Sequence, residues 1–300
     1  MGAEVESKKR VGVIGLGAMG SGIARTCLEA GYRVSIWNRS SDKVTPLVAL
    51  GAIACDKPDE VLESNRHVVV CVADYAAWMQ IVSNHGLEEH LVDTTIIQLT
   101  GGSIDDVTEH ETFIAESGGR MADGALMCFP SQLGTSEASI LVAGAPDILA
   151  DCDPLLRVLD PDWTNLGEDI TKPAVLSRAL TAGILSSFVG YVNGLAICRE
   201  AGIPIDVYIN QSVKADAIVP GEKRRLAEAV RDGRTEHTEA SIDTWVGAHQ
   251  TIHAVAEALG TNLVLQDAVK SALQEARQMG YGEHDLAALV EVFAANQPRS

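Results

Sequence analysis

The sequence predicts an α/β protein whose first half forms a doubly wound sheet and whose second half is helical, with one long helix between them. Three observations carry this prediction. Short apolar runs alternate with helical segments over residues 11–166. A glycine-rich turn directly follows the first apolar run. From Thr171 onward glycine and proline become sparse and helical periodicity dominates.

The first apolar run, Val11–Ile14, ends in glycines, as buried parallel strands do. A helix is predicted over residues 19–30, with Gly31 as its C-terminal glycine. Residues 33–37 form the second predicted strand. Helical segments separate most of the further strand candidates, which are residues 67–72, 95–99, 120–122 and 139–142. This alternation predicts a parallel sheet and a first domain over residues 1–168.

A long interdomain helix is predicted over residues 173–201, within a linking segment 169–201. Pro173 suits its first turn, and Gly202 and Pro204 end it. Its apolar residues cover more than one stripe, and a helix that is hydrophobic all round is buried on all sides. We expect helices of a second subunit to bury it. The remaining helices, at about residues 206–232, 238–259, 264–279 and 284–295, build a helical dimerisation and substrate domain over 202–300.

Composition excludes several partners. The 300 residues carry 41 acidic and 23 basic side chains, a formal net charge of −18. Nucleic-acid-binding proteins present a basic face, and only residues 8–10 and 223–225 form short basic clusters here. An anionic membrane is disfavoured for the same reason. The N-terminus is polar without an apolar signal region, and the spacing of the six cysteines fits no disulfide framework or zinc site. We expect a cytoplasmic protein that uses no metal.

The sharpest motif is a G-x-G-x-x-G between the first strand and the first helix. The first glycine permits a tight turn, the second lets a pyrophosphate approach the backbone, and the third lets helix and strand pack closely. The free N–H groups and positive dipole of the helix N-terminus face the phosphates. This pattern predicts a Rossmann domain that binds a dinucleotide at Gly15, Leu16, Gly17, Ala18, Met19 and Gly20.

The end of the second strand predicts NADPH as the cofactor. An NAD site usually has an acidic residue here to accept bonds from the ribose hydroxyls. This chain has Asn38 instead, which does not repel a 2′-phosphate. Arg39 can pair with that phosphate, and Ser40 and Lys43 can add a donor and a charge. We also expect Val72, Ala73 and Thr100 to contact the cofactor.

Residues 11–43 resemble the β-hydroxyacid dehydrogenase superfamily, including NADP-using members with N-R-[ST]. Residues 123–144 are similar to the D-G-A-I-M and I-G-T-P-E-A-T-I-L stretches of imine reductases, and residues 99–103 to their L-T-[SN]-G-T. Residues 280–291 resemble the C-terminal G-H-G-x-E-D-x-A-A-L-I-E of imine reductases and reductive aminases. The resemblance spans nearly the whole chain. It implies a domain-swapped homodimer with active sites between one subunit's cofactor domain and the other's helical domain.

The chain departs from these relatives where they place a proton donor. Hydroxyacid dehydrogenases of the superfamily use a lysine on the long helix, and this position falls at Ser177. Serine cannot replace that lysine as a general acid or base near neutral pH. Imine reductases often have aspartate or tyrosine on this helix. Those positions fall at Ser177 and at Ala182 or Leu185, none of which is acidic or phenolic.

Two explanations stay open: the proton comes from elsewhere, or the substrate needs none. A preformed iminium already carries the charge that hydride transfer neutralises, so its site needs cation stabilisation rather than an acid. Asp243 is the candidate carboxylate, although a solvated or capping role is equally compatible with its place on a helix. Tyr191 is an alternative donor. We expect the substrate pocket to include Ser177, Leu185, Trp245 and His249.

These observations predict an NADPH-dependent reductase of a C=N bond, in an imine or a preformed cyclic iminium, with a possible role in natural-product biosynthesis. One alternative is a hydroxyacid or semialdehyde dehydrogenase of the same superfamily, which the missing lysine disfavours. Another is a catalytically silent NADPH-binding protein. Neither His249 and His253 nor any other spacing carries a metal signature such as H-E-x-x-H.

Overall fold

The structure, a computed structural model, describes residues 9–236 and 238–294. Residues 1–8, with the first residue of the basic cluster 8–10, and residue 295 of the last predicted helix lie outside the described residues. The chain forms two compact units that divide between Ala182 and Gly183. This division falls inside the long helix, whereas the sequence placed boundaries after residues 168 and 201.

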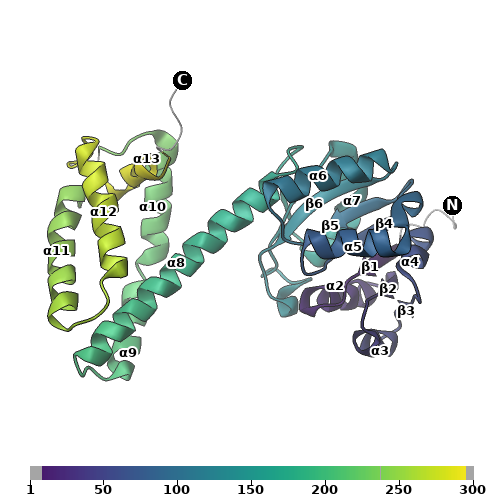
Figure 1. The fold of residues 1–300 in the computed structure, drawn as a ribbon, viewed down its shortest axis with the longest axis horizontal. Helices are drawn as coiled ribbons and strands as arrows, with labels where there is room; N and C mark the ends of the chain where they lie inside the picture. Colours follow the sequence, from purple (N-terminus) through teal and green to yellow (C-terminus); the bar gives the residue numbers. More distant parts are fainter. Residues whose placement is uncertain (1–8, 237, 295–300) are drawn as a thin grey trace. The chain divides into compact units, whose positions relative to one another are not determined.

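The first unit is built on one eight-stranded sheet (Figure 1). In spatial order its strands are β3 (Ile53–Ala54), β2 (Arg33–Trp37), β1 (Arg10–Ile14), β4 (His67–Val70), β5 (Thr95–Gln98), β6 (Arg120–Leu126), β7 (Ile140–Ala143) and β8 (Thr164–Asn165). From β1 the chain adds β2 and β3 on one side, and from β4 it adds the later strands on the other side. This order confirms the doubly wound α/β class.

One pair of neighbouring strands departs from the predicted parallel sheet. β6 and β7 run antiparallel, whereas every other neighbouring pair is parallel. The segment between them contains only a short 3-10 turn, Pro130–Gln132, and no crossover helix. Parallel strands need a long crossover and antiparallel strands do not, so the direction reverses at this point.

Helices cover both faces of the sheet and bury two apolar cores. On one face, α2 (Ala18–Glu29) and α7 (Pro146–Leu159) pack against side chains such as Val13 and Ile36. The opposite core includes Ile14 and Val70, beneath α4 (Pro58–Ser64), α5 (Tyr75–His85) and α6 (Ile104–Glu116). A short α3 (Thr45–Val48) follows the second strand. This arrangement leaves the carboxyl ends of the parallel strands as the edge available to a ligand.

The long helix α8 (Lys172–Glu200) matches the predicted helix within one residue at each end. Many of its apolar side chains are exposed, namely Val175, Leu180, Ile184, Leu185, Phe188, Val189 and Val192. By length and hydropathy alone, α8 is the one helix among the described residues that could cross a membrane. A helix buried between subunits has the same composition.

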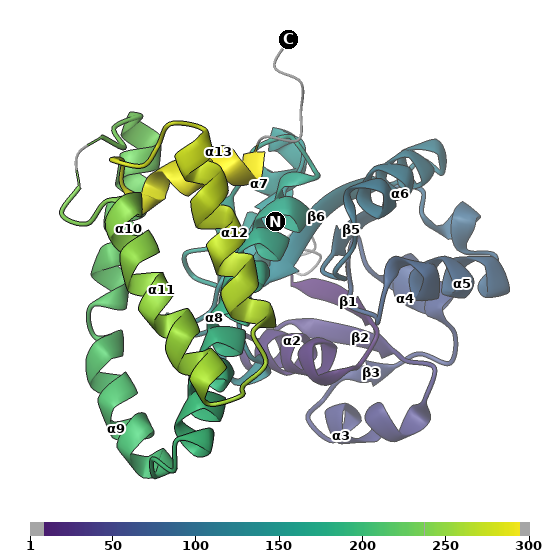
Figure 2. The ribbon, with the colours of Figure 1, turned by 60° about the vertical axis from the view of Figure 1, so that its left-hand side comes forward.

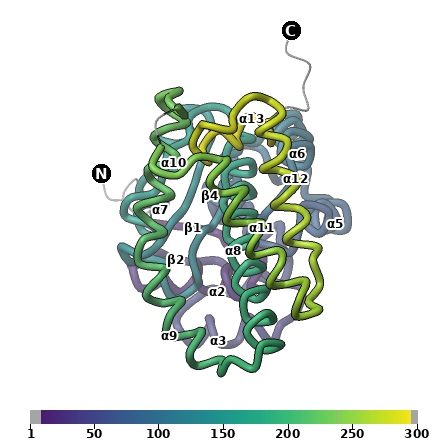
Figure 3. The backbone as a smooth tube through the Cα atoms, turned by 90° about the vertical axis from the view of Figure 1, so that its left-hand side faces the viewer, coloured from purple at the N-terminus to yellow at the C-terminus, as the bar shows by residue number. Residues whose placement is uncertain are grey.

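The second unit continues with α9 (Ile205–Asp216), α10 (Val219–Asp232), α11 (Ile242–Ala258), α12 (Val264–Gln278) and α13 (Leu289–Ala294). α11 and α12 lie side by side (Figures 2 and 3) and bury a small core that includes Ile242 and Leu273. The single helix predicted over residues 206–232 is wrong, because α9 and α10 are separate. Pro220 is the second residue of α10 and has no N–H, so it cannot donate the hydrogen bond that would continue α9 into α10.

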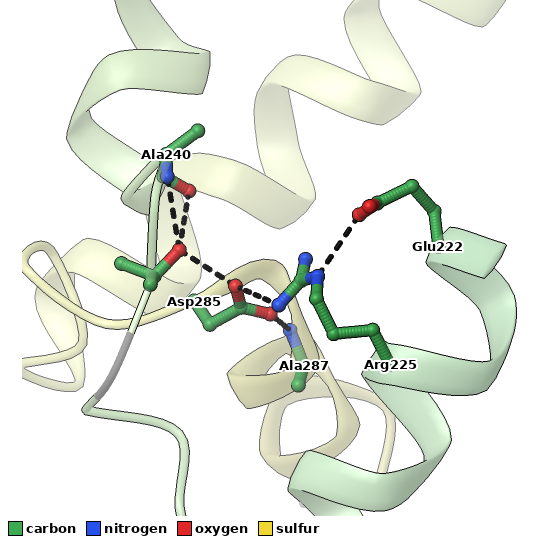
Figure 4. A network of polar contacts seen from close by, with 6 residues as sticks. Glu222, Arg225, Ala240, Asp285 and Ala287 are labelled. Carbon is green, nitrogen blue, oxygen red and sulfur yellow. Dashed lines mark hydrogen bonds and ion pairs between the residues drawn. The ribbon is translucent and has the colours of Figure 1, made fainter. Parts of the chain in front are cut away.

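Asp285 connects α10, the loop before α11 and the turn that follows Asp285 itself (Figure 4). Its buried carboxylate accepts hydrogen bonds from the Arg225 guanidinium at 2.7 Å, the Thr238 hydroxyl at 2.6 Å and the Ala287 N–H at 2.9 Å. Burial alone would raise the pKa of Asp285, but these bonds lower it overall. Asp285, the aspartate of the C-terminal motif, therefore has a structural role.

Candidate active site

The glycine-rich turn places its three glycines in three different environments. Gly15 has a φ of +94°, and a Cβ there would collide with the carbonyl oxygen of Cys71. A Cβ on Gly20 would collide with the carbonyl oxygen of Gly15, so this glycine lets α2 pack against the turn. A Cβ on Gly17 would meet no atom within 4 Å. The free space beside Gly17, at the start of α2, fits an approaching pyrophosphate.

Asn38 joins this turn to the end of β2. Its Oδ1 accepts a hydrogen bond from the Leu16 N–H at 2.9 Å, and its Nδ2 donates to the Ser40 carbonyl at 3.0 Å. The side chain therefore positions two loops at once. A neutral amide satisfies both bonds without the negative charge that would oppose a 2′-phosphate, and the exposed Arg39 follows directly.

A cavity of about 1270 Å³ lies along the carboxyl ends of the parallel strands. Small-molecule pockets are roughly 300–1,000 Å³, so this cavity can hold a dinucleotide. It collects most of the predicted cofactor residues: Gly15, Leu16, Gly17, Ala18, Met19, Gly20, Asn38, Arg39, Ser40, Lys43, Val72 and Ala73. Among the described residues that line it, the only carboxylate belongs to Asp56.

Thr100 supports the cavity wall but does not line it. This residue is buried, and its hydroxyl accepts a hydrogen bond from the Val72 N–H at 3.1 Å. The Thr100 N–H in turn donates to Oε1 of the buried Gln98 at 3.3 Å. The neighbouring Leu99 and Gly101 line the cavity instead. Thr100 therefore fixes the loop after β4 relative to the loop after β5.

The first half of α8 adds three polar side chains to the cavity: Ser177, Arg178 and Thr181. Ser177 is buried, and its hydroxyl donates to the Ala174 carbonyl at 3.0 Å. Ser177 therefore lines the predicted pocket, but its hydroxyl hydrogen is already used in a hydrogen bond within the helix. The sequence reasoning missed Arg178 and Thr181. A signal for Arg178 was present, because it is the only charged residue between Pro173 and Cys198.

The remaining predicted site residues lie in the second unit. Leu185 is 60% exposed and Trp245 is 42% exposed. Tyr191 packs against Tyr208, with 5.2 Å between ring centroids, and its carbonyl accepts a bond from the Tyr208 hydroxyl. Their roles toward a substrate stay predictions.

Asp243 lies in the first turn of α11, where Ser241 is the N-cap. Its half-exposed carboxylate forms an ion pair with Arg277 at 2.5 Å. This pairing gives Asp243 a local role in joining α11 to α12, and its predicted role at a substrate cation stays a prediction.

His249 lies in a second, smaller cavity of about 270 Å³ between α11 and α12. It is only 7% exposed, and its Nε2 atom has no hydrogen-bond partner. His253, one turn later, contacts the Asp267 carboxylate through Nε2 at 3.1 Å. No group of three or more histidine, cysteine or acidic side chains in the described part of the chain is arranged to hold a metal ion.

A buried polar group that the sequence did not reveal lies beneath α5 and α6. The Tyr75 hydroxyl donates to Asp123 at 2.6 Å. Burial raises the pKa of Asp123 to about 7, against the opposing effect of that bond. His110 packs edge-on against Tyr75 and Trp78, and burial lowers its pKa to about 4. Asp123 opens the D-G-A-I-M-like stretch, but Tyr75 and His110 come from distant segments, so no local motif shows that the three residues meet.

Two family models match the chain in succession. Residues 10–167 match the NAD-binding domain of 6-phosphogluconate dehydrogenase, and residues 169–295 match the C-terminal domain of NADPH-dependent reductive-aminase-like proteins. Together they cover both units of the structure.

Individual relatives agree with this assignment. An NADPH-dependent reductive aminase from Aspergillus oryzae is 25% identical and covers 95% of this chain and 97% of its own length. The structure of an imine reductase from Myxococcus stipitatus in complex with NADP+ is 28% identical, with a TM-score of 0.90 over 95% of this chain and 99% of that one. A glyoxylate/succinic semialdehyde reductase from Arabidopsis thaliana is 23% identical over 94% of this chain and 97% of its own.

Proposed function

This chain belongs to the imine reductase and reductive aminase family of the β-hydroxyacid dehydrogenase superfamily, and on that premise we propose that it reduces a C=N bond with NADPH. It is an NADP-dependent oxidoreductase, and NADPH is its cofactor. The observation that carries the proposal is the cavity at the strand ends, which combines the glycine turn with Arg39, Ser40 and Lys43.

The residues of the cavity divide the work of holding the cofactor. The N-terminus of α2 and the open space at Gly17 accept the pyrophosphate. Arg39 and Lys43 hold the 2′-phosphate. Asn38 fixes the glycine turn relative to the loop after β2. When bound, NADPH supplies a hydride to the carbon of the C=N bond. The wall formed by Val72, Ala73 and Leu99 positions the substrate end of the cofactor.

The polar residues near the start of α8 favour an iminium substrate. Ser177 donates its hydroxyl proton to a helix carbonyl, and Asp56, the one carboxylate among the described lining residues, follows β3 on the side of Arg39. A preformed iminium needs no proton at the hydride step. We therefore propose a cyclic iminium as substrate, with natural-product tailoring as its context. Asp243 and Tyr191 remain the proposed stabilising carboxylate and alternative donor.

The molecule is proposed to act as a homodimer, domain-swapped as in the resemblance described above. The support is the exposed apolar surface of α8, which a single subunit of this chain leaves uncovered. The resemblance supports a substrate site between subunits, which dimer formation would complete. A cytoplasmic location is part of the same proposal.

The test follows the absorbance of NADPH in two assays: cyclic imines, N-alkylated iminium salts or semialdehydes are added with NADPH, and hydroxyacids are added with NADP+. We expect oxidation of NADPH with the C=N substrates only. For a permanently charged iminium the rate should be nearly flat between about pH 6 and 9, because no proton is transferred. Turnover of semialdehydes or hydroxyacids alone would instead support the dehydrogenase alternative, and binding of NADPH without any turnover would support a silent cofactor-binding protein.

A further inference from the structure

We infer that Arg178 binds a carboxylate of the substrate, so that the C=N compound reduced here is an imino acid or an iminium that carries a carboxylate. The inference rests on the proposed function and names its substrate class. It is carried by the placement of one unpaired guanidinium in the cavity wall.

Arg178 lies on α8, directly after Ser177, and lines the same cavity as the glycine turn. Its guanidinium packs against Gly101 in the loop after β5. A Cβ placed on Gly101 would come within 2.5 Å of an Arg178 Nη atom, so the absence of a side chain at 101 makes room for the cation. The guanidinium therefore reaches the strand ends that the substrate end of the cofactor approaches.

No protein group neutralises this cation. Across residues 9–236 and 238–294, Arg178 takes part in no hydrogen bond or ion pair, although the chain has 41 acidic residues. A guanidinium that faces a ligand cavity without an internal partner is free to bind an anion from the ligand.

The 2′-phosphate of the cofactor lies out of reach of Arg178, because of the distance along the sheet. Arg39 and Lys43 follow β2, whereas Gly101 follows β5, and β1 and β4 lie between these strands. Three strand spacings amount to about 14 Å. The two cations at the end of β2 therefore serve the 2′-phosphate, and Arg178 serves a different anion.

The charge of the substrate supports a carboxylate. A bare iminium beside an uncompensated guanidinium would be repelled, whereas a carboxylate on the same molecule pairs with the planar fork of Arg178 and offsets the iminium charge. In the reaction, the nicotinamide C4–H bond of NADPH would break and its hydride would form a C–H bond to the C=N carbon. The substrate would react as its iminium, in which the nitrogen already carries its proton or alkyl group, so that the C=N π pair would move to nitrogen and leave a neutral amine, with NADP+ and an amino acid as the products.

The first experiment compares a cyclic imine that carries a carboxylate on the C=N carbon with the same ring without it. We expect the wild type to favour the acid. Arg178→Leu should lower kcat/KM for the acid by roughly 10- to 100-fold, and should not lower it for the carboxylate-free ring, whose cation the guanidinium no longer repels. Arg178→Lys should retain part of the preference. Arg25→Leu removes the same charge from an exposed site of the same unit outside the cavity and should change neither rate.

A second experiment needs no turnover. Calorimetric titration of the NADP+-bound protein compares a saturated cyclic amino acid with the matching carboxylate-free amine, in wild type and Arg178→Leu. We expect the acid to bind about 10-fold more tightly in the wild type and the preference to vanish in the variant. If the preference persists in the variant, or is absent from the wild type, the Arg178 inference is overturned. If the binding preference for the acid depends on Arg178 but neither ring oxidises NADPH, the proposed function is wrong and the carboxylate-binding role of Arg178 is supported. Unchanged NADPH affinity shows that the variant is folded.

Discussion

At the scale of single residues, Asn38 shows how one side chain serves both structure and selectivity. The sequence predicted only that an amide would not repel a 2′-phosphate. In the structure the same amide bonds to Leu16 and Ser40, and so holds the loop that presents Arg39. We therefore propose that Arg39 supplies the positive charge that selects NADPH, with Lys43 lining the same cavity.

Replacement of Arg39 by glutamine should weaken NADPH binding by about 10-fold or more, because a charge-assisted contact to the 2′-phosphate is lost. NADH has no 2′-phosphate, so its affinity should change by less than about 2-fold. Titration of both cofactors by protein fluorescence measures this split. Equal losses for NADPH and NADH would show that Arg39 does not contact the 2′-phosphate, and Arg25→Gln is the matched control at an exposed site outside the cavity.

The buried carboxyl of Asp123 predicts a pH-dependent contribution to stability. Its pKa is about 7 in the folded chain, against roughly 3.9 when unfolded, so folding takes up a proton between these values. The contribution is fully present below about pH 4 and is lost as the pH rises to 7. Since Asp123→Asn cannot ionise, we expect it to gain stability relative to wild type over this range, by about 1.4 kcal/mol per pH unit at most.

Urea unfolding of both proteins at pH 4.5 and 7.5 measures this difference. His110 is present in both, so its own effect cancels. His110→Phe tests a shift of the opposite sign, because burial lowers the pKa of His110 to about 4. The wild type should lose stability from this histidine as the pH falls from 6.5 toward 4, and the phenylalanine variant should not. A wild-type-minus-Asp123→Asn difference that stays constant with pH would contradict the raised pKa.

At the scale of elements, the turn between β1 and α2 separates packing from ligand binding. Gly20 has no room for a Cβ beside the Gly15 carbonyl, whereas Gly17 opens to free space. Gly20→Ala should therefore lower the melting temperature. Gly17→Ala should fold normally but bind NADPH at least about 10-fold more weakly, because the methyl group occupies the approach of the pyrophosphate. Calorimetry and cofactor titration distinguish the two, and tight NADPH binding by Gly17→Ala would contradict this account of the turn.

Most elements were predictable because their patterns are local. The strand Arg33–Trp37 and the long helix follow from periodicity and from the glycine and proline residues that end them. The two-residue strands β3 and β8 are too short to show a period. The antiparallel direction of β7 follows from the short connection that precedes it, not from the residues of the strand. The break between α9 and α10 was predictable from Pro220, which the single predicted helix ignored.

The site was predictable to the extent that it is contiguous in sequence. The glycine turn and the predicted residues after β2 form local motifs and line the cavity, whereas Thr100, in the loop after β5, does not line it. Arg178 depends on where α8 meets the loop after β5, and the pair of Tyr75 and Asp123 joins segments 48 residues apart. Such pairings arise only from the assembled sheet and its helices.

At the scale of the whole molecule, the exposed apolar surface of α8 predicts a dimer. Phe188 is 64% exposed in the single chain, and a dimer that covers α8 would bury it. Phe188→Asp should therefore shift the protein from dimer to monomer in sedimentation velocity, because a buried unpaired charge is costly. Val92→Asp, at a 55% exposed valine of the first unit, is the control and should leave the mass unchanged. A wild-type protein that sediments as a monomer would contradict the dimer.

We propose that hydride passes from NADPH to the carbon of a C=N bond. The most direct measurement is single-turnover reduction of a cyclic iminium with NADPH that carries deuterium at both nicotinamide C4 positions, followed by mass spectrometry and NMR of the product. We expect one deuterium per product molecule, bound to the former C=N carbon, with stoichiometric formation of NADP+. Product without deuterium at that carbon, or oxidation of NADPH only with carbonyl substrates, would contradict it.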